Sequence, residues 1–93
     1  MAVAVVSLRI SLPGAQSLKD KRRIVRSLKD RLRRRFNVAV AEMDHHDVWQ
    51  TASLAIVTIS PDGAFARSTA SQVAGFVGSD PKLSLLDYKV EVF

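Results

Sequence analysis

Hydrophobic and polar residues alternate in two stretches of this 93-residue chain, residues 6–12 and residues 86–92. A period of two is typical of a β-strand with one buried face. Residues 38–41 and 49–60 are apolar or β-branched runs, and they predict two further strands. The polar residues 44–47 between these two runs are consistent with the turn of a hairpin.

Two other stretches repeat their apolar residues with the 3.6-residue period of a helix. The first helix should begin at Ser17, because Ser17 and Asp20 have the spacing of an N-cap residue and its N3 partner, and it should end near Phe36. The second should begin at Ser60-Pro61-Asp62, with Ser60 as the N-cap, and stop at Gly78. The expected buried stripes are Leu18, Val25, Leu28, Leu32 and Phe36, with Ile24 at the edge, and Phe65, Thr69, Val73, Phe76 and Val77.

The predicted element order is therefore β-α-β-β-α-β, an α+β arrangement. Right-handed crossovers put both helices on one face of a four-stranded antiparallel sheet, which is the ferredoxin-like sandwich. Residues 1–93 should form a single domain, because a chain of this length has room for one core. The same fold serves enzymes, RNA binders and regulatory modules, so it does not decide the function.

Composition excludes several classes of function. Hydrophobic residues make up 47% and charged residues 25% of the chain, as in ordinary globular domains. The chain has no cysteine, so it has no disulfide, no thiolate metal site and no cysteine nucleophile. The apolar run at residues 2–8 is followed by Arg9 and is far shorter than the roughly 20 residues of a membrane-spanning helix. We expect a cytoplasmic protein with no membrane partner.

Positive charge is concentrated in one segment. The net charge is +5, and residues 19–35 hold ten of the fourteen Lys and Arg but only two of the nine acids. This segment therefore carries +8, and the rest of the chain carries −3. A charge distribution of this kind favours an acidic partner such as RNA.

At about 100° per residue, four cations of the first helix form a row beside its apolar stripe. These are Arg22, Arg26, Lys29 and Arg33. Lys19, Arg23 and Arg34 lie on the back of the helix, and we expect Lys19 and Arg23 to support the row in binding the phosphate backbone of RNA or of a ribosomal particle.

The alternative is a solvated helix face, in which Asp30 pairs with Arg26 or Arg34 and the cations of the last turn complement the negative end of the helix dipole. That alternative does not account for Lys19, Lys21, Arg22 and Arg23, because these cations lie near the positive end of the dipole.

Asp44, His45, His46 and Asp47 form the sequence's one candidate metal or catalytic cluster. Consecutive loop residues rarely converge on one ion, and these are the chain's only two histidines. Asp-His-His is also found in the DHH phosphoesterases, but those enzymes need further acidic motifs spread over a longer chain. We therefore expect turn chemistry here, with no metal, no cofactor and no catalytic residue.

Two features of the third predicted strand bear on binding. Trp49 is interpreted as a large anchor at the edge of the core, or alternatively as a stacking partner for a base. The two central strands carry no internal aromatic, which excludes the base platform of an RRM. Residues 54–59 are apolar on both faces of the strand, so the open sheet face either carries small residues outward or packs against a second copy or another protein.

Residues 17–50, with the opening strand and Leu12-Pro13-Gly14, resemble the YlxP-like family of bacterial proteins, a family catalogued as a domain of unknown function. The residues that carry the resemblance are Ser17-Leu18-Lys19, Lys21-Arg22-Arg23, Arg31-Leu32, Phe36-Asn37-Val38, Ala41-Glu42 and Asp47-Val48-Trp49-Gln50. The resemblance implies the ferredoxin-like fold and, because genes of the family lie beside those of transcription, translation-initiation and ribosome-maturation factors, a role near RNA or the ribosome. It implies no catalytic residue.

This chain departs from the family pattern at His46, where Gln is expected, and in its second helix, which is poor in charge. The leading hypothesis is a non-enzymatic RNA- or ribosome-associated accessory factor that acts through the first helix. The alternative is a self-associating protein-interaction or regulatory module that uses the open sheet face.

Overall fold

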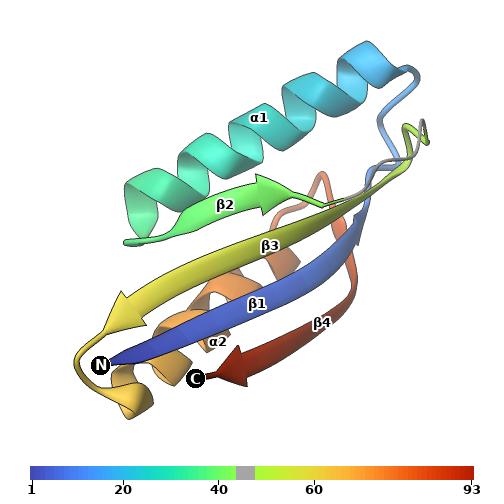
Figure 1. Cartoon of the computed structure of the whole chain (residues 1–93). Coiled ribbons are helices and arrows are strands. Elements are labelled where there is room, and N and C mark those ends of the chain that lie inside the picture. Colours follow the sequence, from blue (N-terminus) through green and yellow to red (C-terminus); the bar gives the residue numbers. More distant parts are fainter. Residues whose placement is uncertain (44–47) are drawn as a thin grey trace.

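A computed structural model describes residues 1–43 and 48–93 of the chain. Its elements follow in the predicted order β-α-β-β-α-β (Figure 1). Their bounds are β1 Ala2–Ser11, α1 Leu18–Arg35, β2 Ala39–Glu42, β3 Thr51–Ser60, α2 Gly63–Gly78 and β4 Ser84–Val92.

The four strands form one sheet in the spatial order β2-β3-β1-β4, and every neighbouring pair is antiparallel. Both helices pack on the same face, with α1 over the β2 side and α2 behind β1 and β4 (Figure 1). This is the ferredoxin-like arrangement, and the predicted fold class is confirmed. The two central strands, β1 and β3, pair along their full ten residues, from Ala2 opposite Ser60 to Ser11 opposite Thr51.

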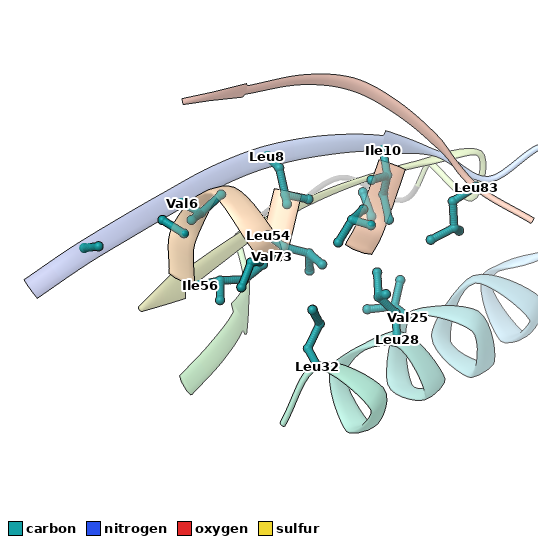
Figure 2. Close-up of a cluster of buried hydrophobic side chains, with 14 of the residues drawn as sticks. Val6, Leu8, Ile10, Val25, Leu28, Leu32, Leu54, Ile56, Val73 and Leu83 are labelled. Atoms are coloured by element: carbon teal, nitrogen blue, oxygen red, sulfur yellow. The ribbon is translucent and has the colours of Figure 1, made fainter. Parts of the chain in front are cut away.

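The core lies between the sheet and the two helices. β1 and β3 each turn every second residue toward the helices, and α1 contributes Val25, Leu28 and Leu32 to the same cluster (Figure 2). Three leucines in the core, Leu8, Leu28 and Leu54, are at most 2% exposed. Truncating a leucine this deeply buried to alanine costs about 2–5 kcal/mol, so these contacts hold α1 on the sheet.

The second helix differs from the prediction at its start and on its buried face. Asp62, and not Ser60, is the N-cap, and its carboxylate accepts a hydrogen bond from the N–H of Ala64. The residues facing the sheet are Ala66, Ala70, Val73, Ala74 and Val77. Phe65, predicted to be buried, is exposed, because the face that approaches the sheet is the one with small alanine side chains.

The outer strands differ in length. β2 has only four residues and pairs with β3 from Ala39 opposite Val57 to Glu42 opposite Leu54. β4 has nine residues and pairs with β1, with an irregular register between Arg9 and Ile10. The sheet therefore ends in a short edge beneath α1 and a long edge on the opposite side.

Candidate nucleic-acid interface

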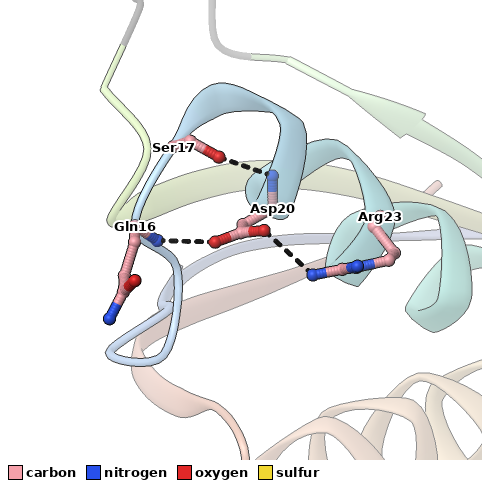
Figure 3. A network of polar contacts seen from close by, with 4 residues as sticks. All are labelled: Gln16, Ser17, Asp20 and Arg23. Atoms are coloured by element: carbon pink, nitrogen blue, oxygen red, sulfur yellow. Dashed lines mark hydrogen bonds and ion pairs between the residues drawn. The ribbon is translucent and has the colours of Figure 1, made fainter.

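The start of α1 is fixed by a small polar network (Figure 3). The Ser17 hydroxyl accepts a hydrogen bond from the N–H of Asp20 at 3.1 Å, as the predicted cap requires. The Asp20 carboxylate accepts from the N–H of Gln16 at 3.0 Å and pairs with the guanidinium of Arg23 at 2.9 Å. An acid here also lies at the positive end of the helix dipole. Arg23 is therefore already partly neutralised by an internal partner.

Lys21, one of the first-turn cations, faces the core side of the helix. The residue is only 4% exposed. Its ammonium donates a hydrogen bond of 2.8 Å to the backbone carbonyl of Val48 and lies 3.7 Å from the carboxylate of Glu42. Buried charges of this kind need such partners. Lys21 therefore joins α1 to β2 and to the segment that leads into β3.

The predicted row lies on the side of α1 that faces the β2 edge. Arg22 and Arg26 are exposed, and Lys29 is half-buried. In the described part of the chain, no carboxylate lies within ion-pair distance of these three cations. The helix thus brings together three positive charges, spaced at i, i+4 and i+7, that have no acidic partner among residues 1–43 and 48–93.

Arg33, the fourth member of the row, has internal partners. Its guanidinium lies 3.6 Å from Asp30 and 3.4 Å from the carbonyl of Val40 in β2. The expectation that Asp30 pairs with Arg26 or Arg34 is wrong, because Asp30 contacts Arg33 at the i, i+3 spacing. The Val40 contact places Arg33, at the end of the row, beside β2.

The opposite side of α1 holds a partly buried ion pair. The guanidinium of Arg31 lies 2.8 Å from the carboxylate of Asp80, whose side chain is only 6% exposed. Burial alone would raise the pKa of Asp80, but hydrogen bonds from the N–H of Lys82 and from Arg31, together with both positive charges, hold the pKa below its ordinary value. This pair connects α1 to the loop after α2.

Arg35 lies over two aromatic rings at the end of α1. The rings of Phe36 and Phe76 pack edge to face at 5.8 Å, and the guanidinium carbon of Arg35 is 5.9 Å and 5.7 Å from their centres. Arg31, Arg34, Arg35 and Phe76 line a shallow hollow of about 510 Å³ between the two helices. Two sides of α1 are therefore cationic, and in the described part of the chain three of the four row residues, Arg22, Arg26 and Lys29, have no acidic partner.

Trp49 is exposed and does not act as a core anchor. It precedes β3, keeps 43% of its surface exposed and lies outside the hydrophobic core. Its neighbour Val48 accepts the hydrogen bond from Lys21, which places this segment beside the first turn of α1. The interpretation of Trp49 as an anchor of the core is therefore wrong.

Lys19, the remaining predicted site residue, is exposed at the start of α1. The candidate cluster at residues 44–47 lies outside the described residues. Elsewhere in the described chain, no three His, Asp or Glu side chains gather as they would around a metal ion. Among the described helices, none has the length and apolar character needed to cross a membrane.

The open face of the sheet is apolar at one end and charged at the other. Ala55 and Val57 both point to this face, since the alternate residues of β3 are buried against the helices. Neighbouring strands add Val3, Val5 and Ala39 to the apolar end. At the other end Arg9 lies 3.4 Å from Asp87, and along β4 Lys89 lies 3.5 Å from Glu91, the residue opposite Val5.

Three basic residues outside the predicted set have defined structural roles, namely Lys21, Arg31 and Arg35. The burial of Lys21 could be predicted from the sequence. Lys21 lies four residues before Val25 and seven before Leu28, so helical periodicity places it on the apolar stripe. The sequence carries no such signal for Arg31, because the partner, Asp80, is 49 residues away in the chain.

Comparisons with known proteins agree with this fold. The family model described as a protein of unknown function, DUF503, matches residues 3–90. The chain is 29% identical over 79 residues to the uncharacterized protein YlxP of Bacillus subtilis strain 168, covering 85% of this chain and 86% of that protein. The solution structure of LFR1 1, a de novo designed protein with a ferredoxin fold, covers 98% of this chain, and the chain covers 86% of LFR1 1. With a TM-score of 0.58 and 18% identity, that similarity concerns the fold alone.

Proposed function

This chain belongs to the family of proteins of unknown function DUF503, and from its own residues we propose that it is a non-enzymatic, cytoplasmic accessory factor that binds structured RNA, in the manner of a ribosome-associated protein. The observation that carries the proposal is the set of three cations, Arg22, Arg26 and Lys29, that have no acidic partner in the described chain. Phosphate groups would neutralise them.

The spacing of the row suits a polyanion better than a small anion. Residues at i, i+4 and i+7 extend over about 10 Å of a helix that rises 1.5 Å per residue. Consecutive phosphates on a nucleic-acid strand are separated by several ångströms, so a row of this length meets more than one phosphate. The contacts would be to the backbone, which positions a protein on RNA but does not read the sequence.

Trp49 supports the RNA form of the proposal. An exposed indole beside the first turn of a basic helix could stack on an unpaired base, and stacking on aromatic side chains is a common mode of RNA recognition. Structured RNA offers both helical phosphates and unpaired bases. We assign Arg22, Arg26 and Lys29 as the main contacts, and Lys19, Arg23 and Arg33 as weaker ones, since Arg23 and Arg33 have internal acidic partners.

Purification from a bacterial host at low and at high salt tests the proposal. RNA or ribosomal particles should co-elute at low salt and be lost at high salt, because phosphate contacts weaken as salt rises. Acidic proteins in the low-salt eluate, without RNA, would instead support a protein partner for α1. The absence of RNA from the wild-type eluate and from a direct binding assay with total RNA at low salt would overturn the proposal.

A second candidate function is favoured by the apolar end of the open sheet face. A self-associating interaction or regulatory module would cover Val5, Val57 and Ile59, and Ile59 is 54% exposed in the monomer. Val57→Lys, or Ala55→Lys beside it, should dissociate such an oligomer without unfolding it. A wild-type monomer at high concentration in sedimentation would remove the homo-oligomeric form of this candidate.

A further inference from the structure

The free edge of β4 is long and carries exposed apolar side chains. β4 is the last strand in the order β2-β3-β1-β4, so one of its sides has no partner strand among the described residues. β4 has nine residues, and within it apolar and charged residues alternate from Leu86 to Glu91. The side chains of Leu86 and Tyr88 are 47% and 53% exposed. A long edge of this kind is a template for a further strand.

The hydrogen bonds of the neighbouring pair show which backbone groups of β4 face outward. Val3 and Phe93 exchange both of their backbone hydrogen bonds, at 3.0 Å and 2.7 Å. Because these bonds alternate along an antiparallel pair, Glu91, Lys89 and Asp87 also direct their N–H and C=O toward β1. Tyr88 and Val90 therefore direct theirs to the open side.

We infer that β4 pairs with β4 of a second copy of this chain, antiparallel and centred on Tyr88, to form a continuous eight-stranded sheet. Tyr88 is the middle residue of Ser84–Val92. The pairing of β4 with β1 skips Leu86, so the central residues Asp87–Lys89 carry this register. The two Tyr88 residues would exchange backbone hydrogen bonds, and Leu86 would lie opposite Val90. Such an interface is isologous and closes after two copies.

Charge selects this register over the adjacent one. Centred on Tyr88, Asp87 of each copy lies opposite Lys89 of the other, and both side chains point to the open face of the sheet. Centred on Lys89, the two Lys89 side chains would oppose each other and Asp87 would oppose Glu91. Opposite charges across a strand pair are stabilising and like charges are destabilising.

Charge also selects β4 over the other edge. The β2 edge lies beside α1, whose segment 19–35 carries +8, so pairing through β2 would bring two such helices together. The β4 edge lies beyond β1 on the far side of the sheet, next to α2, and in α2 Arg67 is the single charged residue. Pairing there leaves the two α1 helices at opposite ends of the sheet.

A single introduced cysteine tests the register, because the chain has none of its own. In a hydrogen-bonded pair the two Cα atoms at position 88 would be about 5.5 Å apart, which is within the range that a disulfide spans. Tyr88→Cys should therefore form a covalent dimer on mild oxidation. Val57→Cys, on the open sheet face, is the matched control and should remain largely monomeric. Crosslinking of the Val57 variant but not of the Tyr88 variant would overturn the inference in favour of the open face.

Charge reversal tests the same register without a crosslink. Asp87→Lys and Lys89→Asp should each weaken dimerisation in sedimentation about tenfold, because each change acts twice across the two-fold axis. The double variant D87K/K89D restores opposite charges and should recover the dimer. Arg9→Gln is the control: it removes the partner of Asp87 within the same copy, and it should leave the dimer intact. A wild-type monomer at millimolar concentration, or a double variant as weak as the single ones, would overturn the inference.

Discussion

The ammonium group of Lys21 donates a hydrogen bond of 2.8 Å to the backbone carbonyl of Val48, a residue 27 positions later in the chain. This contact joins the first turn of α1 to the segment that carries Trp49. The carboxylate of Glu42, 3.7 Å away, adds β2 to the same cluster. Lys21 therefore differs from the neighbouring cations, because it holds the candidate interface together from inside.

Lys21→Met should lower the free energy of unfolding by about 1.5–3 kcal/mol, the usual range for hydrogen bonds to charged groups. Methionine keeps much of the side-chain length, so the loss can be assigned to the ammonium. Urea unfolding measures it. RNA affinity of the folded variant should keep the same salt dependence. A smaller salt dependence at unchanged stability would instead make Lys21 a phosphate ligand.

Protonation of Asp80 should lower the stability of the folded protein at acid pH. The pKa of Asp80 in the folded protein is below the ordinary value of 3.8, so its contribution is fully present above that pH and is lost as pH falls through the lower folded pKa. Asp80→Asn should therefore be less stable than the wild type at neutral pH, with the difference shrinking below about pH 4. Urea unfolding at several pH values measures this. A constant difference across that range would contradict the role of the Arg31 pair.

Local sequence patterns predicted the element order and the fold because alternation, helical periodicity and the Ser17 cap are properties of neighbouring residues. The start of α2 was missed because Ser60 and Asp62 are both good caps, and the backbone path after β3 decides between them. The predicted buried position of Phe65 was wrong for a related reason. Which face of α2 meets the sheet depends on how closely the two can approach, and the alanines allow the closest approach.

The candidate site was predictable only in part. The angular row of cations follows from helical geometry alone, and the structure places Arg22, Arg26 and Lys29 on one side of α1. Which of the cations are already neutralised depends on contacts with Asp20, Asp30 and Asp80, and of these three acids Asp80 alone comes from a distant part of the chain. The exposure of Trp49 likewise depends on where β3 begins.

Trp49→Ala should weaken RNA binding by about 1–3 kcal/mol if its ring stacks on a base. Its effect on stability should be small, because Trp49 lies outside the core. Phe65→Ala, which removes a more exposed aromatic from α2, is the control and should leave RNA affinity unchanged. Equal losses of affinity from the two variants would show that Trp49 has no specific role.

Neutralising the row tests the central claim, that cations of α1 without internal partners bind RNA phosphates. With Arg22, Arg26 and Lys29 as three phosphate contacts, the slope of log affinity against log salt should be about −2 to −3 for the wild type. Arg22→Gln and Arg26→Gln should each reduce the size of that slope by about one unit, and similarly for RNAs of different sequence. Glutamine favours helix almost as well as arginine, so the fold should be retained.

Arg23→Gln should have a smaller effect, because Arg23 pairs with Asp20. Arg67→Gln, in α2, is the matched control and should leave the slope unchanged. The most direct measurement is therefore the salt dependence of RNA affinity for the wild type, Arg26→Gln and Arg67→Gln, recorded together. The account predicts a slope reduced by about one unit for Arg26→Gln alone. Equal slopes for the two variants, or no measurable binding of the wild type at low salt, would contradict it.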